Sequence, residues 1–177
     1  MSKKNKKIEI EYKFKIDDPI ALFQKIEGAP PEVLYIKDEI YGPGIGIPPK
    51  VRKRRIYRAD GTTEVQYEQT TEMDGDIKTV LEEEVASIPD EFGLENSYEK
   101  IRYYFDRGRY EIMVDFYPIG IFCEIEGPER VIEPIAKELG FDTSRTINDN
   151  IAVYYRDKRK AEGLGDWYHW GFGKMKQ

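Results

Sequence analysis

The stretch that decides the fold is IEIEYKFKI, residues 8–16, in which apolar and charged residues alternate without a break. Strict alternation over this length predicts a β-strand, because successive side chains of a strand point to opposite faces of the sheet. One face is then apolar, and the other carries Glu9, Glu11, Lys13 and Lys15. An ordinary half-buried strand turns such a charged face to water, so the remaining strands must show whether this one does.

The composition describes one acidic globular domain. The chain has 177 residues, with 28 Lys and Arg against 34 Asp and Glu, a formal net charge of -6. This balance argues against a nonspecific nucleic-acid binder, which needs a dominant basic field. The single cysteine, Cys123, excludes an internal disulfide and fits a reducing compartment. No apolar run approaches the roughly 20 residues that cross a bilayer, so we expect a cytoplasmic protein with neither a nucleic-acid nor a membrane partner.

The chain is expected to contain one domain between two tails. Residues 1–7 form a basic tail that lacks the apolar core of a signal peptide. Residues 8–160 form the domain. Residues 161–177 form an aromatic C-terminal tail that either docks on the domain or is mobile.

Strand patterns dominate the domain. A helix is expected over 17–28, where Asp17 or Asp18 can cap and Pro19 suits the first turn, and a second over 129–140. A polar helix is expected from Arg145 to about Ala161. Seven strand patterns join the first one, namely 33–41, 51–58, 62–72, 79–87, 97–105, 109–117 and 120–127. Their order predicts an α+β, mainly β fold, an eight-stranded antiparallel closed barrel with flanking helices.

Like-charged residues recur two positions apart on several of these strands, so each pair lies on one face. The pairs are Arg52 and Arg54, Glu82 and Glu84, Lys100 and Arg102, and Glu124 and Glu126, with Asp115 alone on its strand. A merely soluble outer face does not need pairs of one sign. If these faces point inward, buried charges must be paired or hold a metal. A polyphosphate with divalent cations satisfies both signs, because Lys and Arg bind phosphate oxygens and carboxylates hold hard cations.

The motif Glu9-x-Glu11-x-Lys13 resembles the signature of the CYTH superfamily, the triphosphate tunnel metalloenzymes, and the other pairs follow in that family's order over residues 8 to about 155. The resemblance implies an eight-stranded tunnel that binds triphosphates with Mg²⁺ or Mn²⁺. It implies phosphate binding by Lys13, Arg52, Arg54, Lys100 and Arg102. It implies metal binding by Glu9, Glu11, Glu82, Glu84, Asp115, Glu124 and Glu126, with Glu9, Glu11, Glu124 and Glu126 as the catalytic set.

Two positions depart from the family pattern. Many members carry lysine where this chain has Glu68, and arginine where it has Val80. Both changes should weaken the hold on a highly charged triphosphate. Lys78 would compensate if it faces inward, since it has the same parity as Val80.

Three functions remain open from the sequence. The first is divalent-metal-dependent hydrolysis of a triphosphate, whether inorganic triphosphate, thiamine triphosphate or a nucleoside triphosphate. The second is a class IV type adenylyl cyclase that converts ATP to cyclic AMP and pyrophosphate, and the third is a noncatalytic triphosphate- or polyphosphate-binding module. His169 is the only histidine, so a catalytic triad of the Ser-His-Asp kind cannot be assembled. A homodimer is compatible with all three.

Overall fold

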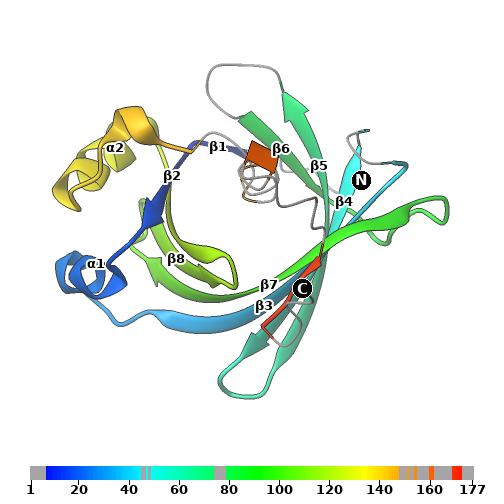
Figure 1. Ribbon diagram of the computed structural model, residues 1–177, viewed down its shortest axis with the longest axis horizontal. Helices are drawn as coiled ribbons and strands as arrows, with labels where there is room; N and C mark the ends of the chain where they lie inside the picture. Colours follow the sequence, from blue (N-terminus) through cyan, green and yellow to red (C-terminus); the bar gives the residue numbers. More distant parts are fainter. Residues whose placement is uncertain are drawn as a thin grey trace.

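The computed structural model describes residues 7–44, 47, 49–73, 79–147, 151, 154, 160–161 and 169–172, and for 7–9, 70–73, 79–83 and 169–170 it describes the backbone alone. These residues form one ten-stranded sheet, which is antiparallel except where β10 joins β7. Two α-helices and a short 3-10 helix accompany it. The predicted α+β, mainly β class is therefore confirmed (Figure 1).

The elements follow the predicted order along the chain, and each predicted strand is present with its ends shifted by a few residues. The largest shift is in β7, which begins at Gly93 instead of at Ser97. Most of the helix expected from Arg145 to Ala161 lies outside the described residues. The strands are β1 Lys7–Glu9, β2 Glu11–Ile16, β3 Glu32–Gly42, β4 Lys50–Arg58, β5 Thr63–Met73, β6 Thr79–Glu84, β7 Gly93–Asp106, β8 Glu111–Tyr117, β9 Gly120–Glu126 and β10 His169–Trp170; the helices are α1 Pro19–Lys25, α2 Glu129–Glu138 and the 3-10 helix Thr143–Arg145.

The predicted first strand is divided between two neighbours. The strand order is β1-β6-β5-β4-β3-β7-β8-β9-β2, so the two strands at its ends are consecutive in the chain and separated only by Ile10. β1 pairs with β6, and β2 pairs with β9. Among the described residues this pairing is a linear path, and the closed barrel that the sequence predicts is not detected.

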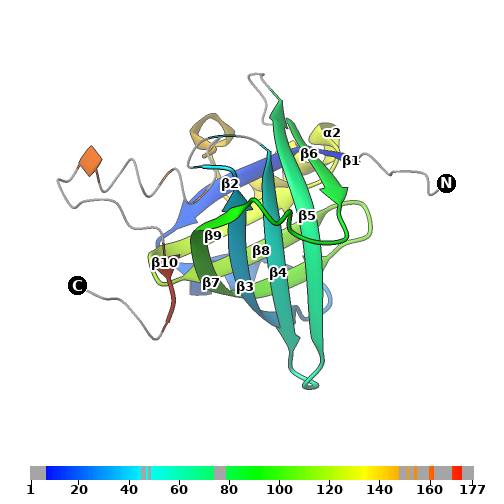
Figure 2. The same ribbon diagram turned by 90° about the vertical axis from the view of Figure 1, so that its right-hand side faces the viewer.

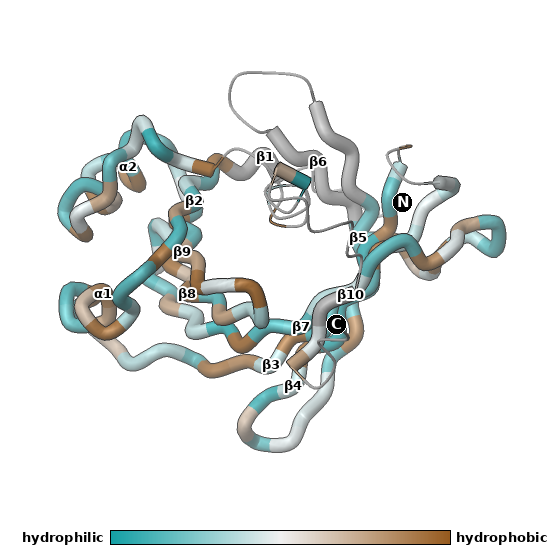
Figure 3. The backbone as a smooth tube through the Cα atoms, in the orientation of Figure 1, coloured by the Kyte–Doolittle hydropathy of each residue, from teal (hydrophilic) through white to brown (hydrophobic). Residues whose placement is uncertain are grey.

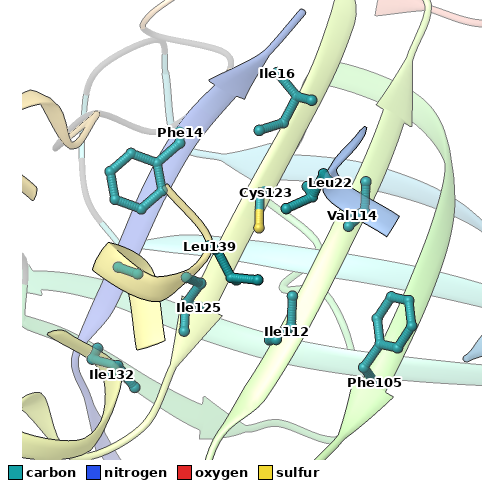
Figure 4. Packing of buried hydrophobic residues seen from close by; sticks show 11 residues of the cluster. Phe14, Ile16, Leu22, Phe105, Ile112, Val114, Cys123, Ile125, Ile132 and Leu139 are labelled. Atoms are coloured by element: carbon teal, nitrogen blue, oxygen red, sulfur yellow. The ribbon is translucent and has the colours of Figure 1, made fainter. Parts of the chain in front are cut away.

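The apolar core lies between the helices and the outer side of β2, β8 and β9. Phe14 and Ile16 of β2 pack with Ile112, Val114 and other buried residues beneath α1 and α2 (Figures 1 and 4). Cys123 belongs to this cluster and is completely buried, so its thiol is a packing group. Each fully buried aliphatic or aromatic side chain contributes about 1.5 to 3 kcal/mol of transfer free energy. The core thus fixes which way these strands face.

The charged residues of the same strands point to the opposite face, because the side-chain period of a strand is two. Hydrophobic and hydrophilic residues follow one another along β3 and β7 (Figure 3). Directly paired residues of neighbouring strands share a face, and the register pairs Lys13 with Glu124, Arg102 with Asp115, and Arg52 with Glu68. We call this side of the sheet the polar face.

Strands β3, β4 and β5 lie side by side in Figure 2, and none of the helices in the described part of the chain covers their outer side. The hairpin between β4 and β5 turns at Gly61, whose φ of 85° suits glycine. None of the helices in the described part of the chain is long and apolar enough to cross a bilayer.

Candidate functional site

Three carboxylates meet at one end of the polar face. Glu11 of β2 is paired in register with Glu126 of β9, and Glu124 lies two residues before Glu126 on the same face. One carboxylate oxygen from each of the three lies within 4.8 Å of the others. We call these residues the carboxylate cluster. A set of oxygen ligands alone fits a hard divalent cation, so the cluster could bind a metal.

Lys13 lies inside this cluster. Its side chain is buried, and its Nζ is 3.0 Å from Glu11 Oε1 and 3.2 Å from Glu124 Oε1. Burial by itself would lower the pKa of Lys13, but the charges of Glu124 and Glu11 outweigh it and raise the pKa above its ordinary value. Lys13 is therefore a fixed ammonium group whose contacts in this structure are carboxylates.

A second group of charges adjoins the cluster on β7 and β8. Asp115 is completely buried and accepts hydrogen bonds from Arg102 Nε at 2.7 Å, Arg102 Nη2 at 2.6 Å and Lys100 Nζ at 2.7 Å. Arg102 Nη2 also donates to Glu124 Oε2 at 2.8 Å. Glu124 therefore joins the cluster to the cations of β7, whereas Asp115, expected as a metal ligand, is engaged by these cations instead.

The environment of Lys100 differs from that of Lys13. Burial and the neighbouring charge of Arg102 lower the pKa of Lys100 to about 8, although Asp115 and Glu124 act in the opposite direction. Its Nζ lies 3.3 Å from the hydroxyl oxygen of Tyr117. Lys100 is thus less firmly held in its charged form than Lys13.

The Arg54 guanidinium is held by an acid that sequence reasoning missed. Asp38 of β3 is completely buried and accepts from Arg54 Nε at 2.9 Å and from Arg54 Nη2 at 3.0 Å. Burial alone would raise the pKa of Asp38, but the charge and hydrogen bonds of Arg54 lower it to about 2. The signal was present in the sequence, because Asp38 shares its parity with the apolar residues Ile36 and Ile40.

Glu68 lies on the polar face and binds Arg52. Arg52 Nε donates to Glu68 Oε2 at 2.9 Å across the β4–β5 pair. The alternate residues of β4 face the other way: Arg55 pairs with Glu39 at 3.0 Å, and Lys53 lies over the ring of Tyr67. The departure at Glu68 therefore places an acid against one of the arginines expected to bind phosphate.

The remaining expected ligands are spread over β1 and β6. Glu84 is exposed and is paired in register with Glu68. Glu9 is paired with Val80, and Glu82 with Lys7, but the side chains of these residues lie outside the described part of the structure, as does all of Lys78.

An aromatic group, also missed from the sequence, lies on the polar face beside Asp38 and Asp115. Tyr98, Tyr117 and Phe122 pack together with Ile151. Tyr98 and Phe122 have the same strand parity as Lys100 and Glu124, which was the available signal. Burial raises the pKa of Tyr117 well above its ordinary value. These rings exclude water from the ion pairs of β7 and so strengthen them.

The polar face is balanced by its own acids. Each expected phosphate-binding residue is within ion-pair distance of a carboxylate: Lys13 of Glu11 and Glu124, Arg52 of Glu68, Arg54 of Asp38, Lys100 of Asp115, and Arg102 of Asp115 and Glu124. A highly charged anion must therefore bring cations with it or exchange partners within these pairs.

Solved structures with this fold are known. A protein from Pyrococcus horikoshii superposes with a TM-score of 0.67 at 19% sequence identity, over 85% of the present chain and 99% of the other. A candidate adenylate cyclase from Vibrio parahaemolyticus gives a TM-score of 0.59 at 15% identity, over 82% and 95% of the two chains. A candidate adenylyl cyclase from Hippeastrum, reported to have a dominant triphosphatase activity, gives 0.54 at 16% identity, over 86% and 96%.

At these identities the likeness establishes the fold. No protein-family profile and no curated protein sequence matches the chain. The resemblance to the CYTH superfamily that the charged pairs indicated is thus confirmed as a resemblance of fold.

Proposed function

We propose that the protein is a divalent-metal-dependent hydrolase of a triphosphate, which it binds on the polar face. The observation that carries this proposal is that an all-carboxylate cluster lies on the same face of one sheet as two rows of buried or half-buried cations, on β7 and β4. The shared fold supports it, since the Hippeastrum protein is described with a dominant triphosphatase activity. Adenylyl cyclase activity is the second candidate, because the Vibrio and Hippeastrum proteins are described as candidate cyclases.

We further propose that the sheet closes into a tunnel with the polar face inside. The two ends of the strand order, β1 and β2, are consecutive in the chain and pair with β6 and β9. Taken as one strand, they give the eight antiparallel strands expected from the sequence. Buried residues such as Asp38 and Asp115 then lie in the wall of an enclosed site, which accounts for their complete burial.

In this proposal Glu11, Glu124 and Glu126 hold Mg²⁺ or Mn²⁺, with Glu9 next to them along the chain. The bound metal supplies Lewis-acid stabilisation of phosphate oxygens. Arg52, Arg54, Lys100 and Arg102 orient the phosphoryl groups and offset the charge that develops during transfer. Asp38 and Asp115 hold Arg54 and Arg102 in fixed positions, so these guanidinium groups need not reorganise when the substrate enters.

Incubation of the purified protein with tripolyphosphate, ATP and thiamine triphosphate, each with Mg²⁺ or Mn²⁺, tests the proposal. Metal-dependent release of phosphate supports hydrolysis, and cyclic AMP supports the cyclase. Binding without turnover favours a noncatalytic module and contradicts both enzymes. Glu39→Gln is the matched control for variants of the polar face, because Glu39 lies on the other face and pairs with Arg55.

A further inference from the structure

Lys13 and a metal ion would compete for the same carboxylate oxygens. The ammonium group contacts Oε1 of Glu11 and Oε1 of Glu124, and both residues belong to the carboxylate cluster. The other oxygen of Glu124 accepts from Arg102. Lys13 therefore offsets part of the negative charge of the cluster, and Arg102 offsets more of it at Glu124.

An ammonium group and a divalent cation cannot both occupy these contacts. They carry the same sign, and at the short separations of the cluster their repulsion is poorly screened because the side chains of Lys13 and Glu124 are largely buried. Oxygens that coordinate a metal also become weaker acceptors for Lys13, because the cation draws part of their negative charge. Binding of a metal therefore requires Lys13 to leave at least one of its two carboxylates.

We propose that Lys13 is the counter-ion of the carboxylate cluster in the absence of metal, and that it moves to a phosphate oxygen when the cluster binds a divalent cation. This proposal rests on the function proposed above. Lys13 thus has two alternative partners, the carboxylates without metal and a phosphate oxygen with metal. Without metal, Lys13 is paired with acids and is not available to phosphate. A free triphosphate then meets a face whose other cations are also already paired with acids. The metal complex of the triphosphate is the ligand class that this arrangement selects.

The inference predicts the direction in which metal affinity changes when Lys13 is removed, and a simple structural role does not predict that direction. If Lys13 competes with the metal, its removal strengthens metal binding in the absence of phosphate. If Lys13 only supports the fold or orients ligands, its removal weakens metal binding or leaves it unchanged. Coupling between two ligands through one group is commonly worth 5- to 150-fold in affinity, and we expect Mn²⁺ to bind Lys13→Met about tenfold more tightly than the native protein.

Calorimetric titration with Mn²⁺ alone tests this. Lys15→Met is the matched control: Lys15 lies two residues along the same strand, is partly exposed, and pairs with Asp17 outside the cluster. Tighter Mn²⁺ binding by Lys13→Met and not by Lys15→Met supports the inference. Equal or weaker binding by Lys13→Met, with triphosphate hydrolysis intact in the native protein, would overturn the inference and leave the proposed function standing.

A measurement on the native chain covers the case in which Lys13→Met does not fold. Proton–nitrogen NMR spectra can follow the ammonium signal of Lys13, which is protected by burial. We expect Mg²⁺ to shift this signal and tripolyphosphate, added with excess Mg²⁺, to shift it again. A signal that Mg²⁺ leaves unchanged would overturn the inference. A shift with Mg²⁺ in a protein that neither binds nor hydrolyses any triphosphate would support displacement of Lys13 and contradict the proposed function.

Discussion

Replacement of Asp38 by asparagine should remove a large and pH-dependent part of the stability. Asp38 is completely buried, and both of its carboxylate oxygens accept from Arg54. Asparagine keeps the size of the side chain but leaves the guanidinium without its counter-charge. Breaking a buried ion pair from one side typically costs 3 to 5 kcal/mol, and we expect Asp38→Asn to lower the free energy of unfolding by about that amount at pH 7.

The pKa of Asp38 sets the pH range of this effect. Its folded-state pKa is lowered to about 2 from an ordinary value of 3.8. A group whose pKa is lowered by folding stabilises the protein above its unfolded-state pKa and loses that contribution as the pH falls through the folded-state value. The carboxylate charge alone is then worth about 2 to 3 kcal/mol, present above about pH 4 and lost towards pH 2.

Urea denaturation of the native protein, Asp38→Asn and Glu39→Gln at several pH values measures this difference. Glu39 is the control because it is the next residue on β3 and forms the equivalent pair with Arg55 on the other, more open face. An ion pair of that kind is worth about 1 kcal/mol or less. If Asp38→Asn costs no more than Glu39→Gln, or if its cost is the same at pH 7 and near pH 3, the reasoning from burial is wrong.

Three further predictions concern ligands. Arg52→Ala and Arg54→Ala should each weaken binding of tripolyphosphate with Mg²⁺ by about 1.5 to 3 kcal/mol, whereas Arg55→Ala should not. If calorimetry shows equal losses of binding free energy in all three variants, these arginines form a basic surface patch instead. Glu68→Lys should tighten tripolyphosphate binding, less so at high salt, because it frees Arg52 and adds a cation; unchanged affinity would place Glu68 outside the site. Glu11→Gln should abolish Mn²⁺-dependent phosphate release with the circular dichroism spectrum retained, and undiminished turnover would refute the metal assignment.

The alternation of residue types predicted most of the sheet. The period of two is a local property, so each strand and the face of each charged residue could be read from the chain itself. It separated Arg52 and Arg54 from Lys53 and Arg55, and the structure places these pairs on opposite faces.

The partner of each charge could not be predicted in the same way. Arg54 meets Asp38, and Arg52 meets Glu68, only because β4 lies between β3 and β5 in one particular register. Register depends on the hydrophobic pattern of two strands together and on the turn between them. The break of the first strand at Ile10 depends likewise on two separate neighbours, β6 and β9.

The long-range partner of β2 has a consequence for biosynthesis. Glu11 to Ile16 pair with β9, which leaves the ribosome only after most of the chain has been made. Until then β2 has a free hydrogen-bonding edge and an uncovered apolar side that includes Phe14 and Ile16. Pairing between such distant segments is slow, and strand edges that stay unpaired during folding tend to aggregate. Charges at every second position make a poor template for a foreign strand, so the residues that would serve the ligand also protect the nascent protein.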